Sequence, residues 1–441
     1  MISNTKTLQS SNDIHSFPSE LKFCSSLYDY ISYSAHKTHP TASLAALFAI
    51  ASAITARGYY THTKASTSLY VIMIGKTGVG KNSIVQAPQK VLKALSVDEK
   101  ILTSSISSTG AINDIFKNQT TAIHIIDEFG DTLGHMMADK GGHLKQVASQ
   151  MKELYSMTNG TYKSVRYSTA GGKNKVDKPW TLERPCYGII GLTTQVQLLE
   201  QLKESMLHDG FLNRFIILNG QDIKPIFPQN PLSDIPPNIL KHLESIKQSG
   251  LVRIYDDNNK ELPFEEEYFQ NDEHVTIKLS AEASIYYNET IGDADIEGSD
   301  IASYCEDDES EVKRAISVRW RENSLRLAVA LTALEKLEEV SLEVLEWCYE
   351  LVKNSSISFL TLFEKDAYTT KYETLKSKAI RWFERQDSDE QFLLSYLARS
   401  ARPFSTLPSR ERKELLDDLV ESHIISEQVD GNTFTYSLVS T

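Results

Sequence analysis

Residues 69–83 read LYVIMIGKTGVGKNS, an apolar run followed by a glycine-rich turn and a lysine. The run 69–74 is almost continuously hydrophobic, which is typical of a strand buried on both faces of a parallel sheet. The turn fits the pattern G-x-x-x-x-G-K, and a helical stretch follows it. In that setting, backbone N–H groups turn inward and hold phosphate groups. The residues in the pattern are Gly75, Gly78, Gly80 and Lys81. An alternative is a glycine-rich turn that binds nothing.

The position after the lysine departs from the usual pattern. It holds Asn82 where a Ser or Thr hydroxyl normally helps to bind Mg²⁺, and Ser83 comes one step later. An amide oxygen can coordinate a hard cation or a water in its shell, though less well than a hydroxyl. We therefore expect a site for ATP and Mg²⁺ in which Asn82 weakens or alters the metal dependence.

A second apolar run, 122–127, ends in the acidic pair Asp127-Glu128. Asp127 lies 46 residues after Lys81. An aspartate there can hold Mg²⁺ through water, and the glutamate can polarise the water that attacks the terminal phosphate. The alternative is an exposed pair without chemistry. Together with the glycine turn, the pair predicts hydrolysis as well as binding.

The rest of the chain predicts an α/β fold with a parallel sheet and additional helical regions. Further strands are expected at 187–192 and 215–218. The Ala-rich run 41–56 is expected to be a buried helix, and residues 221–275 mostly loops with one strand. The segment 292–311 has nine acidic residues and no basic ones, which predicts a solvated loop or tether. We expect four regions: helical 1–60, an ATPase core at 61–225, an acidic insert with a helical lid at 226–370, and 371–441 as a separate unit.

Composition limits the function classes. The 441 residues carry a net charge of −13, which disfavours a uniform coat of nucleic acid but leaves room for a local basic surface. The four cysteines form no C-x-x-C pair, as expected in a reducing cytoplasm without a zinc site. The polar N-terminus lacks the basic-then-apolar order of a secretory signal, and the 16 uncharged residues at 41–56 are too few to cross a bilayer.

With these motifs, the chain resembles AAA+ ring ATPases. It is most similar to the helicase-like ATPase family of prophages and mobile elements, whose members are often fused to primase modules. The resemblance covers residues 17–360, and its segment DGFLNRF is also similar to minichromosome-maintenance helicases. The matching segments, in order, are GKTGVGKN, IIDEFG, ELYSMTNGTYKSVRY, YGIIGLTTQ, DGFLNRFIIL and SLRLAVALTALEKL.

The resemblance implies three further roles, two of which have an alternative residue. Arg214 matches an arginine finger that reaches the γ-phosphate of a neighbouring subunit in a ring, implied to be a hexamer. A guanidinium there would neutralise developing charge; the alternative is that Arg214 pairs with Asp209 or another nearby carboxylate. Thr194 matches the polar sensor that positions attacking water, with Thr193 as the alternative. Arg326 is the candidate for a second nucleotide sensor on the helical lid, followed by Arg321.

Residues 161–180 predict a β-hairpin around the glycine-containing segment AGGKNK. In ring helicases of similar pattern, a hairpin here grips the phosphate backbone in the central pore. Tyr162 and Tyr167 are candidates for stacking on bases. A solvated hairpin is the alternative. The candidate DNA-binding cations are Lys163, Arg166, Lys173 and Lys175, with Lys178 nearby.

The C-terminal unit predicts three helices followed by two β-prone arms around an Asp-Gly turn, the pattern of a winged helix. Arg410, Arg412 and Lys413 open its third helix and are candidates for contact with DNA. Such units also bind proteins, and this helix becomes acidic after Lys413.

These features together predict a cytoplasmic, ring-forming ATPase that translocates along or unwinds single- or double-stranded DNA during replication of a phage or mobile element, with a primase as a candidate partner. One rival is an AAA+ protein that remodels a protein or loads a helicase. Another is a DNA-binding initiator or defence ATPase in which ATP switches assembly.

Overall fold

The computed structural model describes residues 16–78, 80, 83–103, 106, 108–137, 143–157, 160–163, 181–201, 210–220, 223–232, 234–250, 274–306, 311–386, 390–431 and 433–439. The chain divides into two compact units, Met1–Leu360 and Thr361–Thr441. The boundary falls within the helix α14 (Leu342–Phe383).

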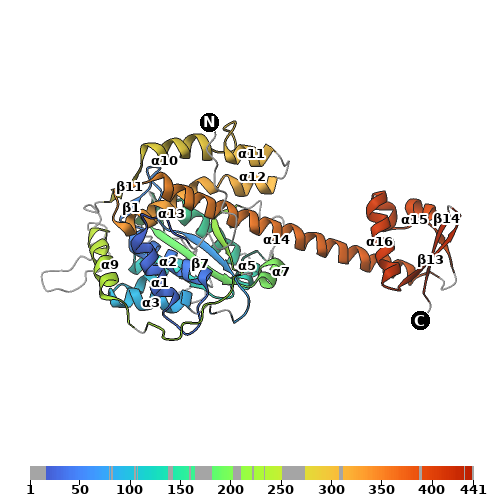
Figure 1. Cartoon of the computed structure of the whole chain (residues 1–441), viewed down its shortest axis with the longest axis horizontal. Coiled ribbons are helices and arrows are strands. Elements are labelled where there is room, and N and C mark those ends of the chain that lie inside the picture. The colour runs from blue at the N-terminus through green and yellow to red at the C-terminus, as the bar shows by residue number, and fades with distance from the viewer. Residues whose placement is uncertain are drawn as a thin grey trace, which may run out of the picture. The chain divides into compact units, whose positions relative to one another are not determined.

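The first unit is built on a parallel five-stranded sheet with the order β3-β4-β7-β2-β8. Figure 1 labels β7, the middle strand of this sheet. Four strands confirm the predicted ones, with ends shifted by at most one residue, because their apolar runs are buried. They are β2 (Tyr70–Ile74), β4 (Thr121–Ile126), β7 (Cys186–Thr193) and β8 (Phe215–Asn219). The edge strand β3 (Ile101–Leu102) has only two residues.

Helices cover the two faces of this sheet. The helix α2 (Pro40–Thr55) contacts β2, β4, β7 and β8, and the aliphatic side chains of this face share one core with it. On β7, Ile190 belongs to that core, whereas a Cβ on the next residue, Gly191, would meet the ring of Phe129. Successive strand residues point to opposite faces. Hence α5 (Phe129–Met137), which begins with Phe129, covers the second face.

The described part of the predicted N-terminal helical region, residues 16–60, contains the helices α1 (Lys22–Ser32) and α2. Pro40 begins α2, and fifteen of its sixteen residues are buried, which confirms the expected interior helix. In the part of the chain that the structure describes, no helix is long and apolar enough to span a membrane.

Two expectations were wrong. Residues 221–275 contain the helix α9 (Pro237–Gly250), which starts at a proline suited to a first helical turn and buries Leu243 and Ile246. The acidic segment 292–311 contains the helix α11 (Asp300–Glu306), in which Ile301 and Ala302 are buried. These two apolar residues anchor α11 to the first unit, so the acidic segment is not simply a tether.

The remaining elements of this unit are mostly short. The helices are α3 (Ser83–Ala94), α4 (Thr109–Asn118), α6 (His143–Ser156), α7 (Gln195–Gln201), α10 (Ala281–Ile285), the π-helix η5 (Tyr286–Ile291), α12 (Glu311–Ser317) and α13 (Trp320–Glu335), with 3₁₀ turns η2 (Asp98–Lys100) and η3 (Leu212–Arg214). The strands form three pairs: β1 (Tyr59–Tyr60) with β9 (Val275–Thr276), β10 (Lys278–Leu279) with β11 (Glu339–Val340), and β5 (Thr161–Lys163) with β6 (Thr181–Glu183).

The second unit has its own apolar core around Phe383, Phe404 and Leu419. A three-stranded antiparallel sheet with the order β12-β14-β13 packs with helices, and Gly431 (φ 59°) lies in the turn between its two long strands. After the end of α14, its elements are β12 (Phe392–Leu393), α15 (Leu394–Ser400), the 3₁₀ turn η6 (Phe404–Thr406), α16 (Ser409–Glu421), β13 (Ile425–Asp430) and β14 (Thr433–Leu438).

Candidate functional site

Most of the residues predicted to act on a nucleotide follow the carboxyl ends of parallel strands. The glycine turn follows β2, the acidic pair follows β4, and Thr194 follows β7. All these ends lie at one edge of the sheet, which we call the carboxyl edge. Ligands of open parallel sheets bind outside this edge. The sequence pattern alone did not show that the strand bearing Thr193 lies between those bearing the turn and the acids.

The glycine turn adopts a backbone that suits its residues. Gly78 and Gly80 have φ angles of 74° and 91°, in the left-handed region that glycine tolerates best. A Cβ at Gly80 would lie 2.8 Å from the carbonyl oxygen of Lys37, so that position is closed to larger residues. Ser83 begins α3 and donates a 3.2 Å hydrogen bond from Oγ to the Gly80 carbonyl. Lys81 and Asn82 lie outside the described residues.

Short contacts join the three strand ends. The backbone N–H of Gly75 donates to the carbonyl of Thr193 at 3.0 Å, which ties the start of the turn to the end of β7. A Cβ on Gly130, two residues after the acidic pair, would lie 2.7 Å from Thr193 Oγ1. The end of β7 therefore contacts both the glycine turn and the segment that carries the acids.

The acidic pair is exposed at this edge. Glu128 has a φ of 52°, an uncommon conformation for a residue with a side chain. Its N–H donates to Asp127 Oδ1 at 3.0 Å, so the aspartate helps to hold this turn. Backbone strain of this kind recurs at functional sites and is retained when the surroundings enforce it.

The two threonines after β7 have different roles in the structure. Thr194 caps α7, because its Oγ1 accepts from the N–H of Gln197 at 3.2 Å and donates to the Gln197 side chain at 3.1 Å. Thr193 is 1% exposed and donates to the Thr194 carbonyl at 3.2 Å. Since Thr193 contacts the acidic segment and the hydroxyl of Thr194 caps a helix, the geometry favours the alternative, Thr193, as the polar group nearest the acids.

Sequence reasoning missed a segment that contacts the glycine turn. Residues 37–39 precede α2, and Thr38 exchanges two backbone hydrogen bonds with Ile226 at 3.0 and 2.8 Å. Lys37 is exposed, its carbonyl borders Gly80, and its ammonium lies 5.4 Å from the ring centre of Phe227. The sequence offers only Pro40, which begins α2 and does not indicate a contact with the glycine turn.

Arg214 lies away from these residues, at the amino ends of the strands. It ends the 3₁₀ turn directly before β8, and that five-residue strand separates it from the carboxyl edge by about 16 Å. Its Nη1 donates to the Gly210 carbonyl, and its guanidinium lies 5.7 Å from the ring centre of Tyr155. Burial, and then the charge of Arg319, lower the pKa of Arg214.

Arg214 also faces open space. It lines a cavity of about 530 Å³ together with Lys152, Glu153, Ser156 and Met157. Its Nε is buried and finds no acceptor among the residues that the structure describes. Asp209, which the sequence predicted as an alternative ion-pair partner of Arg214, lies outside those residues.

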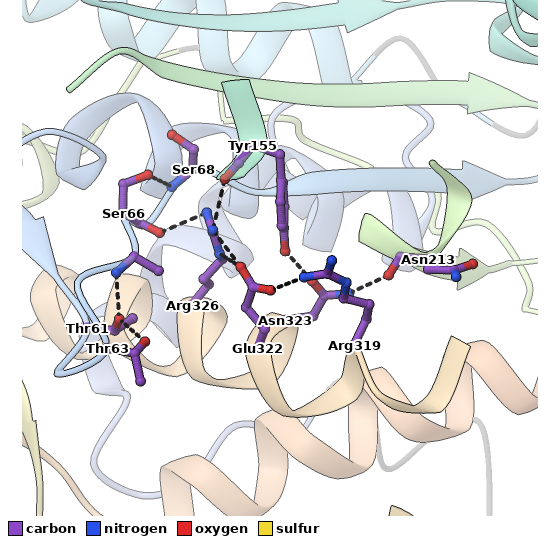
Figure 2. Close-up of polar contacts among 11 residues, drawn as sticks. Thr61, Thr63, Ser66, Ser68, Tyr155, Asn213, Arg319, Glu322, Asn323 and Arg326 are labelled. Atoms are coloured by element: carbon purple, nitrogen blue, oxygen red, sulfur yellow. Dashed lines mark hydrogen bonds and ion pairs between the residues drawn. The ribbon is translucent and has the colours of Figure 1, made fainter. Parts of the chain in front are cut away.

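Arg326 is also at the amino edge and is 2% exposed (Figure 2). It donates to Glu322 Oε1 at 2.7 Å and to the carbonyls of Tyr155 and Ser66 at 2.9 and 3.4 Å. Ser66 precedes β2, so these bonds hold Arg326 at the end of the sheet opposite the glycine turn. The structure does not bring Arg326 to the nucleotide-site candidates of its own chain. Arg321, the other candidate, lines a separate cavity near Arg326.

The predicted hairpin is present at its base, where β5 and β6 pair in antiparallel register from Thr161↔Glu183 to Lys163↔Thr181. Lys163 is exposed there. The expectation that Tyr162 stacks on bases was wrong: its ring is 1% exposed and its hydroxyl donates to Asn113 Oδ1 at 2.6 Å, because it faces the core side of the strand. Arg166, Tyr167, Lys173, Lys175 and Lys178 lie in a part of the chain that the structure leaves undescribed.

The candidate cations of the second unit differ in availability. Arg412 donates to the carbonyls of Phe404 and Leu407 at 2.9 and 2.6 Å, so its guanidinium holds the turn before α16. Arg410 is exposed and pairs with Glu414 at 2.9 Å, and Lys413 is exposed. Five acidic side chains on α16 outnumber these three cations.

Among the described side chains, no group of three or more His, Cys, Asp and Glu residues could hold a metal ion. Asp127 could still share Mg²⁺ with phosphate oxygens, since Mg²⁺ usually takes only one or two carboxylates beside substrate phosphates. Comparison of the chain with protein-family models and with curated proteins finds no match.

Proposed function

We propose that the chain is an ATPase of the AAA+ type and that the carboxyl edge is its nucleotide site. The observation that carries this proposal is the convergence of three segments: the glycine turn with two left-handed glycines, the buried end of β7, and the exposed acidic pair. These segments come from separate parts of the sequence, so a turn that binds nothing would not require their convergence.

Each residue has a definite task in this proposal. The N–H groups of the turn and Lys81 bind the phosphates, and the N-terminus of α3 adds the favourable end of its dipole. Asp127 and Asn82 hold Mg²⁺, which neutralises phosphate charge when it is bound. Glu128 accepts a proton from the attacking water, and Thr193 or Thr194 orients that water.

We propose further that the active assembly is a ring, with a hexamer as the expected form. Arg214 lies about 16 Å from its own carboxyl edge and borders a cavity, which suits a finger offered to a neighbouring chain. The ring would translocate along or unwind DNA in the replication of a phage or mobile element, with the hairpin above β5 and β6 as its grip. A primase remains the candidate partner.

A specific observation favours a second function, the remodelling of a protein or the loading of another helicase. Arg412 supports a turn, acidic side chains dominate α16, and Tyr162 is buried, so part of the predicted DNA surface is committed elsewhere. An ATP-switched initiator or defence ATPase is the remaining alternative.

Hydrolysis is tested with two variants and two matched controls in the full-length chain. Lys81→Ala should abolish ATP binding, and Glu128→Gln should retain binding but lose hydrolysis. Lys93→Ala and Glu200→Gln alter exposed residues of α3 and α7 and should hydrolyse ATP at the rate of the unaltered chain. Normal turnover in Lys81→Ala or Glu128→Gln would refute the assignment.

The ring is tested by mixing. Arg214→Ala should reduce the rate of hydrolysis at least about 1,000-fold, the usual effect of an arginine finger. A mixture of Arg214→Ala and Lys81→Ala should recover activity, because some interfaces then join an intact Arg214 to an intact Lys81. If the mixture exchanges subunits and stays inactive, Arg214 does not act on a neighbour.

Unwinding of a forked DNA separates the two candidate functions. The helicase proposal expects strand separation that requires ATP and falls when Lys163, Lys173 and Lys175 are changed to alanine. DNA-independent hydrolysis without strand separation would favour the remodeller.

A further inference from the structure

A second cavity lies at the amino edge of the sheet, remote from the glycine turn. It measures about 860 Å³, which is within the range of small-molecule sites. The loop before β2, the end of α6, the π-helix η5 and the start of α13 all contribute to its wall. The side chains on which the argument depends are Lys64, Tyr287, Arg319, Arg321, Glu322 and Arg326. We call it the amino-edge cavity.

The amino-edge cavity is positively charged. Four of its described lining residues are cationic and two are acidic, so positive charge is in excess. Glu322 forms ion pairs with Arg326 at 2.7 Å and with Arg319 at 2.5 Å. Arg321 pairs with Asp293 through Nη1 alone, at 3.4 Å. Lys64 donates to Thr276 Oγ1 at 3.4 Å and has no carboxylate partner among the described residues. Arg321 and Lys64 therefore keep donors that an anion can use.

Arg321 is held in place but incompletely bonded. Its guanidinium lies 4.4 Å from the ring centre of Tyr287 and donates to Asn288 Oδ1 at 3.0 Å. Its Nε is buried and has no acceptor within the described part of the chain. A buried donor without a partner costs free energy, which a ligand oxygen would recover. Nothing in the carboxyl-edge site uses this donor.

The local backbone adds a second, independent indication. Tyr287 and Asn288 belong to the π-helix η5, and π-helical turns are frequent at functional sites. Lys64 has a φ of 65°, a strained conformation for a residue with a side chain. The ring centres of His62 and Tyr287 lie 5.3 Å apart in a T-shaped arrangement. Burial, and then the charge of Arg321, lower the pKa of His62. His62 is therefore neutral at pH 7 and adds a hydrogen-bonding group without further charge.

We propose that the amino-edge cavity binds a phosphorylated small molecule that carries at least two negative charges. Arg321 and Lys64 bind the phosphoryl oxygens, because a guanidinium and an ammonium are the side chains best suited to phosphate. This site is distinct from the carboxyl edge and does not depend on the proposed ATPase function.

Calorimetric titration of the full-length Lys81→Ala chain with inorganic pyrophosphate tests the site, because that variant lacks the lysine of the carboxyl edge. We expect binding of one pyrophosphate per chain, weakened at least tenfold by Lys64→Gln and by Arg321→Gln. Arg314→Gln is the matched control: Arg314 is exposed, pairs with Asp295 at 2.7 Å and lies outside the cavity, so its variant should bind normally.

Two outcomes would overturn the proposal, and a repeat titration identifies the class of ligand. Lys64 is exposed on a loop, so Lys64→Gln remains informative even if Arg321→Gln misfolds. Absence of binding to the Lys81→Ala chain below about 10 mM, or binding that both substitutions leave unchanged, would overturn the proposal. A repeat titration with ADP identifies the source of the phosphoryl group: tighter binding than pyrophosphate indicates a nucleotide, and equal or weaker binding indicates an inorganic or other phosphate.

Discussion

The two carboxylate oxygens of Glu322 bind different arginines. Oε1 accepts from Arg326, which is 2% exposed, and Oε2 accepts from Arg319, which is partly exposed (Figure 2). Burial raises the pKa of Glu322, but Arg326 and Arg319 outweigh it and hold this pKa below its ordinary value. The carboxylate therefore compensates a charge in the interior, and its loss would leave Arg326 unpaired.

Glu322→Gln should destabilise the first unit by about 3 kcal/mol, since breaking a buried ion pair leaves an uncompensated charge. Because the folded pKa is lowered, this stabilisation is present above the unfolded pKa of about 4.3 and is lost as the pH falls through the folded pKa. The melting temperature of the variant should thus lie below that of the unaltered chain at pH 7, and this difference should be smaller at pH 3. Glu289→Gln, at an exposed position, should change little at either pH. An equal difference at both values would contradict this account.

At the scale of elements, the sequence predicted what local patterns determine. The long strands follow from apolar runs, and the positions of the glycines and acids follow from motif spacing. It could not predict β3, whose two residues are too few to form a pattern, or the contact of Lys37 with Gly80, which depends on distant segments. The prediction that Tyr162 stacks on bases was wrong for the same reason, because the direction of its side chain depends on a contact with the distant residue Asn113.

The strands β5 and β6 allow the contribution of the exposed Lys163 to be separated from that of the buried Tyr162 hydroxyl. Lys163→Ala should lower the dependence of DNA affinity on salt by nearly one unit of slope if Lys163 contacts a phosphate. Tyr162→Phe should leave this slope unchanged but lower stability by about 1 kcal/mol, because it removes a buried hydrogen bond. Titrations of fluorescent DNA at several salt concentrations measure both slopes. A larger effect of Tyr162→Phe on DNA affinity would mean that the Tyr162 hydroxyl contributes to DNA binding.

At the scale of the whole molecule, the chain consists of two units with separate cores. The segment SLRLAVALTALEKL, the last of the motif segments in the sequence, lies within the first unit, which ends at Leu360. The expected boundary at 371 was ten residues too late, because α14 continues through the division and its helical pattern offers no break. The four regions expected from the sequence thus follow the order of its motifs, whereas the structure has two compact units.

Separate cores predict separate unfolding. Phe404 is fully buried between the rings of Trp382 and Phe383, so Phe404→Ala should destabilise the second unit by about 4 kcal/mol. Calorimetry should show one transition moving to lower temperature while the other stays in place. Phe434→Ala, at an exposed position of β14, is the control. A shift of both transitions together would show that the units unfold as one.

The left-handed backbone of Glu128 has an evolutionary consequence. Glycine would adopt this φ without strain, so Glu128→Gly should melt at a higher temperature than Glu128→Gln, although both lack the carboxylate. If the proposed chemistry holds, selection for heat resistance alone would favour the inert glycine at this position. A glutamate that persists there would then record continued demand for turnover, obtained at the expense of robustness.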